Sequence, residues 1–340
     1  MKNKRMGRTG LQVSEICLGT MTFGWQCDED TSRAIMDTAF DAGVYFFDTA
    51  DVYPMGGGLD DTGKSEEIIG RWMAGKRHQM VIATKVRAQM GRGPNDGGLS
   101  RRHIFDAIEG SLRRLNTDCI DLYQTHSVDW NTPLEETLRA LDDVVRQGKV
   151  RYIGCSKYPA WLLAKALWTS DKYNLSRFDC IQPRYNILFR EVENEIYPLC
   201  KDQGIGIIPF NPLGGGVLTG KYSYDEQRPV GSRFEILHGT NRQTYDKWYW
   251  HEDQLSLISN LKDYFAKRGK SMTQVALAWV LANPLITAPI VGASSVEQLQ
   301  QSLPAVDLTL DEEEMKILDD VWFALPRQRD YEVARGPLRE

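Results

Sequence analysis

The chain has 340 residues, 42% of them hydrophobic, and a formal net charge of -5, so it can bury a sizeable core in one large domain or two smaller ones. No Lys/Arg-rich run points to a nucleic-acid partner, and no run of about 18 apolar residues is present to span a membrane. The opening stretch, MKNKRMGRTGLQ, has no apolar centre, so we expect no secretory signal. Six cysteines without a CxxC pair predict reduced thiols in a cytoplasmic protein.

Eight short apolar stretches are expected to be β-strands. They alternate with longer amphipathic patterns almost from end to end, and each is nearly continuously apolar, as parallel strands covered on both faces are. The predicted strands span 14–19, 44–49, 80–86, 120–126, 151–156, 180–182, 204–210 and 286–292.

The helices between these strands have recognisable ends. The stretch from Thr132 to Glu135 predicts a capping box with proline at the first helical position, and Gly148 marks the end of that helix. Ser100 and Ser271 are expected to begin two further helices by the same capping logic.

The repeated strand–helix units, without a compositional break, favour one α/β domain over 1–340, a single (β/α)8 TIM barrel. An N-terminal β-hairpin with its turn at Gly7–Gly10 is expected to close the bottom of the barrel. The alternative is an open doubly wound sheet, but the chain has neither a GxGxxG turn after a strand nor GxxxxGK[ST]. Residues 222–253 show no clear periodicity and are expected to form a long loop at the C-terminal face.

Four ionisable side chains fall at or just after the ends of successive predicted strands, where barrel enzymes carry their chemistry. Asp48 and Lys85 end the second and third strands, Tyr53 follows Asp48 in the next loop, and His126 ends the fourth strand. An ammonium beside a phenol oxygen favours the phenolate, so Lys85 is expected to lower the pKa of Tyr53. Asp48 would keep Lys85 charged and in place. His126 would donate a hydrogen bond to a substrate oxygen or relay a proton.

These four residues predict a general acid aimed at a carbonyl oxygen. The carbonyl carbon then needs a hydride, which no side chain supplies, so a nicotinamide cofactor is expected. The alternative is a metal-dependent barrel hydrolase that uses Asp48, His126 and Asp129. The chain has only five histidines and no HxH pair, so metal ligands are scarce and we expect no metal.

Motifs spread over most of the chain carry a resemblance to a known family. They are CLGTMTFG, FDTADVY, ATK, DLYQTH, IGCS, IQPRYN, PFNPLGGGVLTGKY and IVGASSVEQLQQS. From about Lys4 to Val321 the chain resembles the aldo-keto reductases, and within them the branch of the potassium-channel β-subunits and bacterial ketone or sugar reductases. The family's catalytic tetrad matches Asp48, Tyr53, Lys85 and His126 without a substitution. The resemblance implies a (β/α)8 barrel and NAD(P)H-dependent reduction of an aldehyde or ketone, with a keto-sugar among the candidates.

The resemblance also implies a cofactor site. Ser156 and Gln182 match the positions that hold the nicotinamide carboxamide, Lys157 stands where the family usually has Asn, and Phe210 matches the aromatic residue that stacks on the nicotinamide ring. Ser294 is expected to begin a helix whose N-terminus faces an anion. The other predicted cofactor residues are Gly19, Thr20, Met21, Asn211, Pro212, Leu213, Gly214, Gly216, Lys221, Arg233, Gly292, Gln298, Gln301 and Ser302.

Several points stay open in the sequence. The family's habit favours NADP(H) over NAD(H), although residues 292–302 contain no Lys or Arg. The specific substrate, the physiological direction and the oligomeric state, a homo-oligomer included, are not fixed. The alternative to an enzyme is an NADPH-binding, redox-sensing subunit of a larger assembly with little turnover. The residues expected to line the substrate pocket are Trp25, Met55, Met90 and Trp130.

Overall fold

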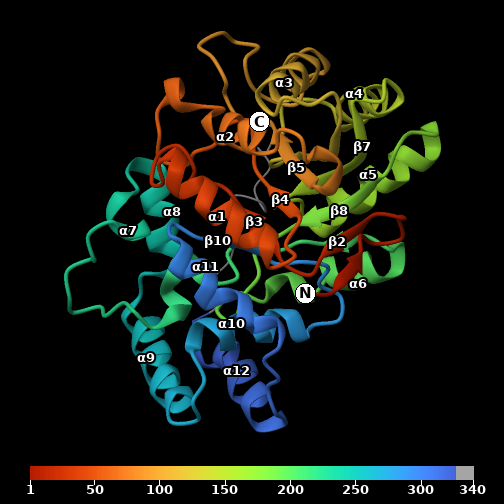
Figure 1. Cartoon of the computed structure of the whole chain (residues 1–340). Helices are drawn as coiled ribbons and strands as arrows, with labels where there is room; N and C mark the ends of the chain where they lie inside the picture. Colours follow the sequence, from red (N-terminus) through yellow and green to blue (C-terminus); the bar gives the residue numbers. More distant parts are fainter. Residues whose placement is uncertain (327–340) are drawn as a thin grey trace.

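A parallel sheet of eight strands lies at the centre of the molecule, and helices lie outside it (Figure 1). The computed structural model describes residues 1–326, so 327–340 of the predicted domain lie outside the described residues. The strand order is β10-β3-β4-β5-β6-β7-β8-β9, in which the strands from β3 to β9 follow their order in the chain and β10 pairs with β3. This order confirms the predicted α/β class with parallel strands and excludes the strand reversal of a doubly wound sheet.

The strands are short, and most are followed by one helix. They are β3 (Cys17–Gly19), β4 (Phe46–Asp48), β5 (Val81–Val86), β6 (Ile120–Thr125), β7 (Val150–Ser156), β8 (Phe178–Gln182), β9 (Gly206–Ile207) and β10 (Ile290–Gly292). The helices are α1 (Glu29–Asp41), α2 (Lys64–Trp72), α3 (Arg101–Arg114), α4 (Leu134–Arg146), α5 (Ala160–Tyr173), α6 (Ile196–Gln203), α7 (Arg233–Ile236), α8 (Gly239–Tyr249), α9 (Glu252–Ala266), α10 (Met272–Ala282), α11 (Val296–Ser302) and α12 (Glu312–Ala324). Within residues 1–326, no helix is long and apolar enough to cross a bilayer.

Two strands are much shorter than predicted. The predicted strand 204–210 is reduced to β9, and 286–292 is reduced to β10. Pro209 and Pro289 lie inside these stretches and have no N–H to donate to a strand ladder. Backbone bonds still join the two segments, because Thr287 N donates to Ile207 O at 2.8 Å and Ile290 N donates to Pro209 O at 2.9 Å.

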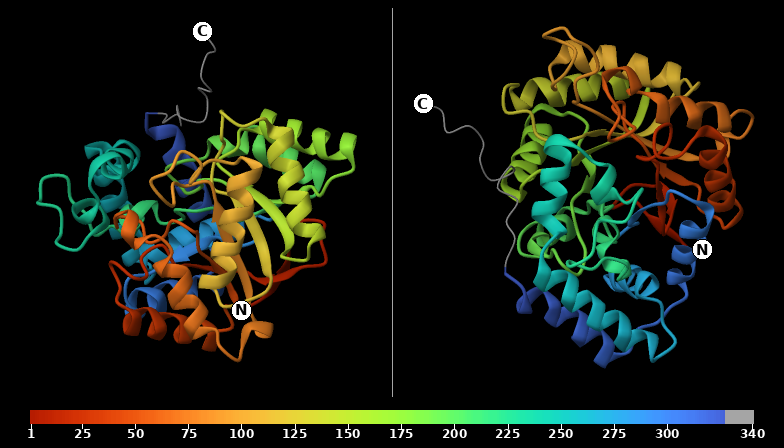
Figure 2. Two further views of the ribbon diagram at one scale, coloured as in Figure 1. Left: turned by 90° about the horizontal axis from the view of Figure 1, so that it is seen from above. Right: turned by 90° about the vertical axis from the view of Figure 1, so that its left-hand side faces the viewer.

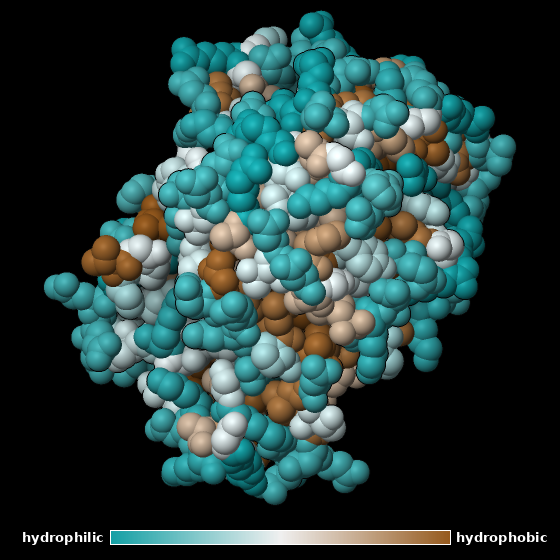
Figure 3. Space-filling model, viewed as in Figure 1, coloured by the Kyte–Doolittle hydropathy of each residue, from teal (hydrophilic) through white to brown (hydrophobic). Residues whose placement is uncertain are grey.

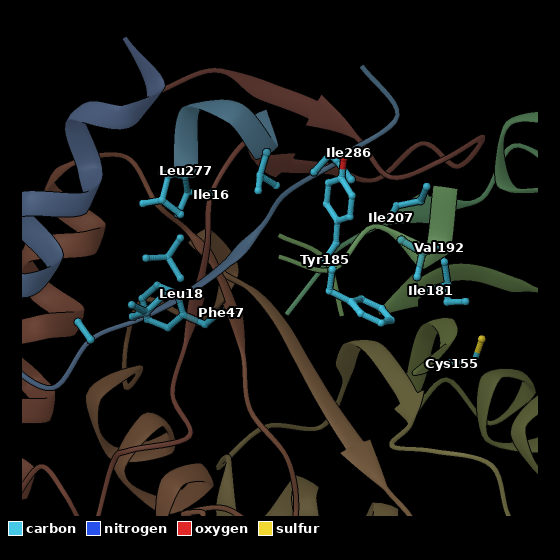
Figure 4. Packing of buried hydrophobic residues seen from close by; sticks show 14 of the residues in the cluster. Ile16, Leu18, Phe47, Cys155, Ile181, Tyr185, Val192, Ile207, Leu277 and Ile286 are labelled. Carbon is cyan, nitrogen blue, oxygen red and sulfur yellow. The ribbon is translucent and has the colours of Figure 1, made fainter. Parts of the chain in front are cut away.

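Successive strand residues alternate between two hydrophobic clusters. Leu18, Phe47 and Ile181 belong to the larger cluster between the sheet and the helices (Figure 4). Their neighbours on the opposite face form the smaller cluster, whose members include Cys17, Phe46, Ala83, Leu122 and Cys180. The period of two therefore gives the sheet an inner and an outer apolar face.

Two N-terminal strands, β1 (Asn3–Arg5) and β2 (Gln12–Ser14), pair antiparallel with Asn3 opposite Ser14. Met6 and Val13 belong to the smaller cluster, so this pair packs against the inner face of the sheet. Gly7 has a φ of 52°, and a Cβ there would lie 2.4 Å from Gly204 O. Only glycine fits this approach.

Residues 222–253 differ from the predicted long loop, because they contain α7 and α8 and the first two residues of α9. In α8, Tyr245 and Tyr249 are buried one helical turn apart. This apolar stripe consists of aromatic residues among charged ones, which hid the helical period. In the left-hand view of Figure 2, α7 and α8 lie to one side of the strands.

The helix ends in the structure agree only in part with the ends predicted from the sequence. Ser100 caps α3 by accepting a hydrogen bond from His103 N, as predicted. The predicted capping box at Thr132 is wrong, since Pro133 is the N-cap of α4 and the Thr132 hydroxyl donates to Asp129 Oδ2 at 2.7 Å. Ser271 is the N-cap of α10 but its side chain makes no capping hydrogen bond.

Hydrophilic side chains cover most of the face drawn in Figure 3, and hydrophobic ones show between them in smaller groups.

Candidate functional site

Asp48, Lys85 and Tyr53 meet at the end of the inner face of the sheet. Lys85 Nζ donates to Asp48 Oδ1 at 2.5 Å and to Thr49 O at 2.7 Å, and it lies 3.4 Å from Tyr53 Oη. Lys85 is fully buried, and Asp48 and Tyr53 are nearly so. A single ammonium therefore joins the carboxylate to the phenol.

The strand alternation explains why these residues meet. Asp48, Lys85 and Gln182 each follow, two residues along the same strand, an inner-face apolar residue: Phe46, Ala83 and Cys180. Because the side-chain period of a strand is two, the polar residues continue the inner face beyond the apolar cluster. The apolar cluster thus forms the floor beneath the polar group.

Gln124 is a member of this group that the sequence analysis missed. It is the register partner of Lys85, and its Nε2 donates to Asp48 Oδ2 at 3.0 Å. Gln182 Nε2 donates to the same oxygen at 2.9 Å. Both oxygens of Asp48 are therefore bonded. Gln124 lies on the inner face of β6, two residues before His126. This spacing was the sequence feature that could have predicted Gln124 as a member of the group.

Burial raises the pKa of Tyr53 above its ordinary value, and the charge of Lys85 offsets only part of this shift. The predicted lowering of this pKa is wrong, because the cost of desolvating a buried phenolate outweighs the nearby cation. Burial also lowers the pKa of Lys85, but the charge of Asp48 and then Tyr53 outweigh it and raise that pKa overall. At neutral pH the phenol thus keeps its proton and the amine keeps its charge.

His126 lies against Tyr53, with the ring centroids 5.6 Å apart and the planes nearly perpendicular. Burial lowers the pKa of His126 well below its ordinary value, and the charges of Lys85, Lys157 and Arg87 act in the same direction. The imidazole is therefore neutral at physiological pH. A neutral imidazole donates a hydrogen bond from one ring nitrogen but is a poor proton source.

A cavity of about 1390 Å³ opens above these residues. Asp48, Tyr53 and His126 line it, whereas Lys85 lies beneath the wall. Most of the predicted cofactor residues line the same cavity: Gly19, Thr20, Met21, Ser156, Lys157, Gln182, Phe210, Asn211, Pro212, Leu213, Gly216, Lys221, Arg233, Gly292, Ser294, Gln298, Gln301 and Ser302. Gly214 is buried behind the wall and does not line it.

The part of the cavity beyond Phe210 fits the pyrophosphate of a dinucleotide. Gly215 and Gly216 form a cradle in the wall there, with φ values of 66° and 98° that glycine adopts without strain, and Gly214, with a φ of 56°, is buried behind them. Asn211 Nδ2 is buried there without a hydrogen-bond partner among the described residues. A buried amide of this kind needs an acceptor, which a phosphate oxygen supplies.

Side chains from α7 and α8 lie over this cradle. Arg233 Nη1 donates to Tyr245 Oη at 3.2 Å, and Tyr245 Oη donates to Asn211 Oδ1 at the same distance. Lys221 lies in the same wall with an exposed side chain, and desolvation followed by the charge of Arg233 lowers its pKa. The two cations therefore lie beside the glycines.

At the far end of the cavity the helix start differs by one residue from the prediction. Ser295, not Ser294, is the N-cap of α11, and its side chain accepts from Gln298 N. The N–H and the hydroxyl of Ser294 donate to Gln298 Oε1 at 3.0 and 3.1 Å. The Ser302 hydroxyl donates to Gln298 O at 2.9 Å, so these polar residues form one bonded group.

Of the residues expected to line a substrate pocket, Met55 lies in the cavity wall. The structure places Trp25, Met90 and Trp130 outside it. Trp25 lies over Gly56, Trp130 stacks on Trp161, and the N–H of Met90 donates to Asp96 O within its own loop. Tyr158, which the sequence also offers for this wall, lines the cavity, and so do the aromatic side chains of Phe189, Tyr222, Tyr245 and Trp248.

The residues considered for a metal-dependent hydrolase do not assemble. Asp129 Oδ2 accepts from Leu99 N and from the Thr132 hydroxyl, both at 2.7 Å, so it holds a loop. In the part of the chain that the structure describes, no group of three or more His, Cys, Asp or Glu side chains has metal-binding geometry. The six cysteines are all free thiols, five of them buried.

Comparison with known proteins identifies the family. Residues 15–322 match the model of the aldo/keto reductase family. An uncharacterized oxidoreductase, YrpG, of Bacillus subtilis is 41% identical over 95% of this chain and 96% of its own. A probable voltage-gated potassium channel subunit beta of Oryza sativa is 37% identical over 91% and 92%. Versiconal hemiacetal acetate reductase of Aspergillus parasiticus is 33% identical over 94% and 96%. The chain therefore belongs to the aldo/keto reductase family, whose members are NAD(P)H-dependent oxidoreductases of small carbonyl compounds.

Proposed function

We propose that the protein reduces an aldehyde or ketone, with keto-sugars among the candidate substrates, to an alcohol with NADPH. One observation carries this proposal: Lys85 Nζ contacts both Asp48 Oδ1 and Tyr53 Oη directly beneath a cavity of about 1390 Å³, which has room for a dinucleotide. A buried phenol with a cation at its oxygen is suited to give a proton to a carbonyl oxygen.

Each residue of the group has a separate role. Tyr53 Oη donates its proton to the carbonyl oxygen, and its raised pKa keeps that proton in place at neutral pH until transfer. Lys85 stabilises the phenolate that remains, and Asp48 keeps Lys85 charged and fixed. Neutral His126 donates a hydrogen bond that orients the carbonyl. A reduced nicotinamide, when bound, supplies the hydride.

The cofactor lies, in this proposal, along the cavity wall with its nicotinamide ring on Phe210. Ser156 and Gln182 hold the carboxamide, and Gly216, Lys221 and Arg233 surround the pyrophosphate, with Gly214 behind them. The polar group at the other end, Ser294, Gln298, Gln301 and Ser302, binds the adenosine end. We favour NADP(H) over NAD(H) from the habit of the family, since the two cations of the cradle face the pyrophosphate that both cofactors share.

We also infer that the sheet closes into a complete (β/α)8 barrel with β1 and β2 across its bottom. The bonds from Thr287 and Ile290 to the segment that contains β9 support closure. The packing of Met6 and Val13 into the inner cluster supports the position of the hairpin.

The proposal is tested by following oxidation of NADPH and NADH with a panel of aldehydes, ketones, quinones and keto-sugars. We expect many turnovers per protein molecule, with a higher kcat/KM for NADPH than for NADH. Tight NADPH binding with a single turnover per molecule would instead identify a redox-sensing subunit. Absence of binding and of oxidation with both cofactors would overturn the proposal.

A further inference from the structure

The first turn of α2 holds Tyr53 by its backbone. Gly63, the N-cap of this helix, has a φ of 88° and no side chain that could cap the helix. Instead, the carbonyl oxygen of Tyr53 accepts hydrogen bonds from Gly63 N at 3.1 Å and from Ser65 N at 3.3 Å. N–H groups at the start of a helix have no partners within the helix, and here the Tyr53 carbonyl supplies one. The position of the Tyr53 main chain is therefore tied to the start of α2.

The side chain of Ser65 fastens the same turn to the sheet. Ser65 is fully buried, and its hydroxyl lies 3.0 Å from both Thr20 O and Thr49 Oγ1. Thr20 follows β3 and Thr49 follows β4, and the Thr20 hydroxyl donates to Asp48 O at 3.1 Å. Each hydroxyl has one proton to donate, so Thr49 donates to Ser65 and Ser65 donates to Thr20 O. The start of α2 is therefore bonded to the ends of two neighbouring strands.

These contacts bear on the distance between the Tyr53 phenol and the Lys85 ammonium. Lys85 Nζ donates to Thr49 O at 2.7 Å, so the residue whose hydroxyl reaches Ser65 also locates the lysine. Tyr53 Oη lies 3.4 Å from this ammonium, which is long for a hydrogen bond from nitrogen to oxygen. A small displacement of the loop that carries Tyr53 would break the contact. Ser65 therefore contacts both segments on which the distance between phenol and ammonium depends.

We propose that Ser65 is a positioning residue for proton transfer, which holds Tyr53 at its distance from Lys85 through the start of α2. This inference rests on the proposed function. Ser65 is fully buried and does not line the cavity, so its hydroxyl acts on the reaction only through its neighbours. Without this hydroxyl, the Thr49 hydroxyl loses its acceptor and Thr20 O loses a donor, so the start of α2 can shift. Misplacement of a reacting group by about 1 Å can lower a rate by about a hundredfold.

A double-mutant cycle with Ser65→Ala and Tyr53→Phe tests this role. The measurement is the rate of NADPH oxidation in a single turnover, with the aldehyde of the panel that the wild type reduces fastest. Ser65→Ala should lower this rate by about 10- to 100-fold, while the Kd for NADPH stays close to that of the wild type. In the Tyr53→Phe background there is no phenol to position, so Ser65→Ala should cause little further loss. A loss of equal size in both backgrounds would show that Ser65 does not act through Tyr53 and would overturn the inference.

Ser14→Ala is the matched control. Ser14 is also fully buried, and its hydroxyl donates to Ile16 O at 2.7 Å and accepts from Phe46 N at 3.2 Å. Phe46 begins β4, whereas Asp48 ends it. Ser14→Ala should therefore lower the free energy of unfolding, as Ser65→Ala does, without changing the single-turnover rate. A rate loss as large as that of Ser65→Ala would assign both effects to general destabilisation and overturn the inference.

Thr49→Val is the second variant, for the case that Ser65→Ala does not fold. It removes the other hydroxyl of the pair, and its rate loss should likewise disappear in the Tyr53→Phe background. A wild type that turns over while Ser65→Ala, or Thr49→Val in its place, keeps the full rate would overturn this inference and leave the proposed function standing. A wild type that oxidises NADPH with no carbonyl compound would remove both.

Discussion

Lys85 and Gln124 are opposite each other in the register of β5 and β6, and each donates a hydrogen bond to a different oxygen of Asp48. The carboxylate that accepts a hydrogen bond from Lys85 is thus itself held by Gln124 of β6. Gln124 is a positioning residue, because it does not line the cavity.

The first prediction concerns Gln124. In Gln124→Leu the Asp48 carboxylate loses one of its buried donors, so we expect the free energy of unfolding to fall by about 1–3 kcal/mol and turnover to fall with it. Urea unfolding and kcat measure the two effects. Gln124→Glu keeps the size but adds a second carboxyl beside Asp48, so its loss should be larger at pH 8 than at pH 5. A Leu variant as stable and active as the wild type would mean that Gln124 does not support Asp48.

The second prediction concerns the pH dependence of reduction. The pKa of His126 is lowered well below about 6.5, first by burial and then by nearby cations. The pKa of Tyr53 is raised above about 10. Neither group then changes charge between about pH 6.5 and 9, and kcat/KM with a neutral aldehyde should be flat over that range. A break near pH 6.5 that disappears in His126→Gln would show that the imidazole titrates normally.

The third prediction concerns Asp51, whose carboxylate oxygens are buried without hydrogen-bond partners among the described residues. Burial, and then the charge of Glu66, raise its pKa well above the ordinary value. Because the folded-state pKa is raised, the stability that this group contributes is fully present below about pH 4 and is lost as the pH rises through the folded-state pKa. Asp51→Asn has no carboxyl group to ionise, so its free energy of unfolding should not show this decrease with rising pH.

Urea unfolding across the pH range tests the expectation for Asp51. The free energy of unfolding of Asp51→Asn relative to the wild type should rise from about pH 4 to about pH 8. Asp60→Asn, at an exposed position, is the control and should follow the wild type. Parallel curves for Asp51→Asn and the wild type would contradict a protonated, buried carboxyl.

The fourth prediction concerns the glycine cradle. Gly215 has a φ of 66°, and a Cβ there would lie 3.0 Å from the Tyr245 ring. Gly215→Ala should displace Tyr245 from Asn211. We expect NADPH binding to weaken about tenfold or more, which is the size of effect that the loss of one charge-assisted hydrogen bond has. Gly148→Ala has a similar φ of 74° with nothing within 4 Å, so it should cost about 1 kcal/mol of stability and leave affinity unchanged. Fluorescence titration with NADPH measures the affinity of each variant. If Gly215→Ala binds NADPH as tightly as Gly148→Ala does, Gly215 has no part in cofactor binding.

The sequence predicted the parts of the site that strand alternation controls. Asp48 ends β4, Lys85 is the last but one residue of β5 and His126 directly follows β6. The inner face that brings Asp48 and Lys85 together follows from a period of two. Gln124 follows the same period, but an uncharged amide two residues before His126 does not by itself indicate a functional role in the sequence. The direction of the Tyr53 pKa shift depends on burial. The sequence prediction considered only the charge of Lys85 and therefore gave the opposite direction.

The sequence could not place residues whose position depends on loops. Trp25 and Trp130 are aromatic residues near strand ends, as a substrate wall requires, yet one covers Gly56 and the other stacks on Trp161. Helix α8 was missed because its buried stripe consists of tyrosines in a charged stretch. In both cases tertiary contacts, not local periodicity, decide the outcome.

The most direct measurement is reduction of an aldehyde by the Tyr53→Phe variant loaded with NADPH. Phenylalanine keeps the ring against His126 but removes the hydroxyl beside Lys85. We predict NADPH affinity close to that of the wild type and a single-turnover rate at least about a hundredfold lower, as expected when a general acid is removed. Reduction by Tyr53→Phe at nearly the wild-type rate would show that the proton comes from another group and would contradict the account.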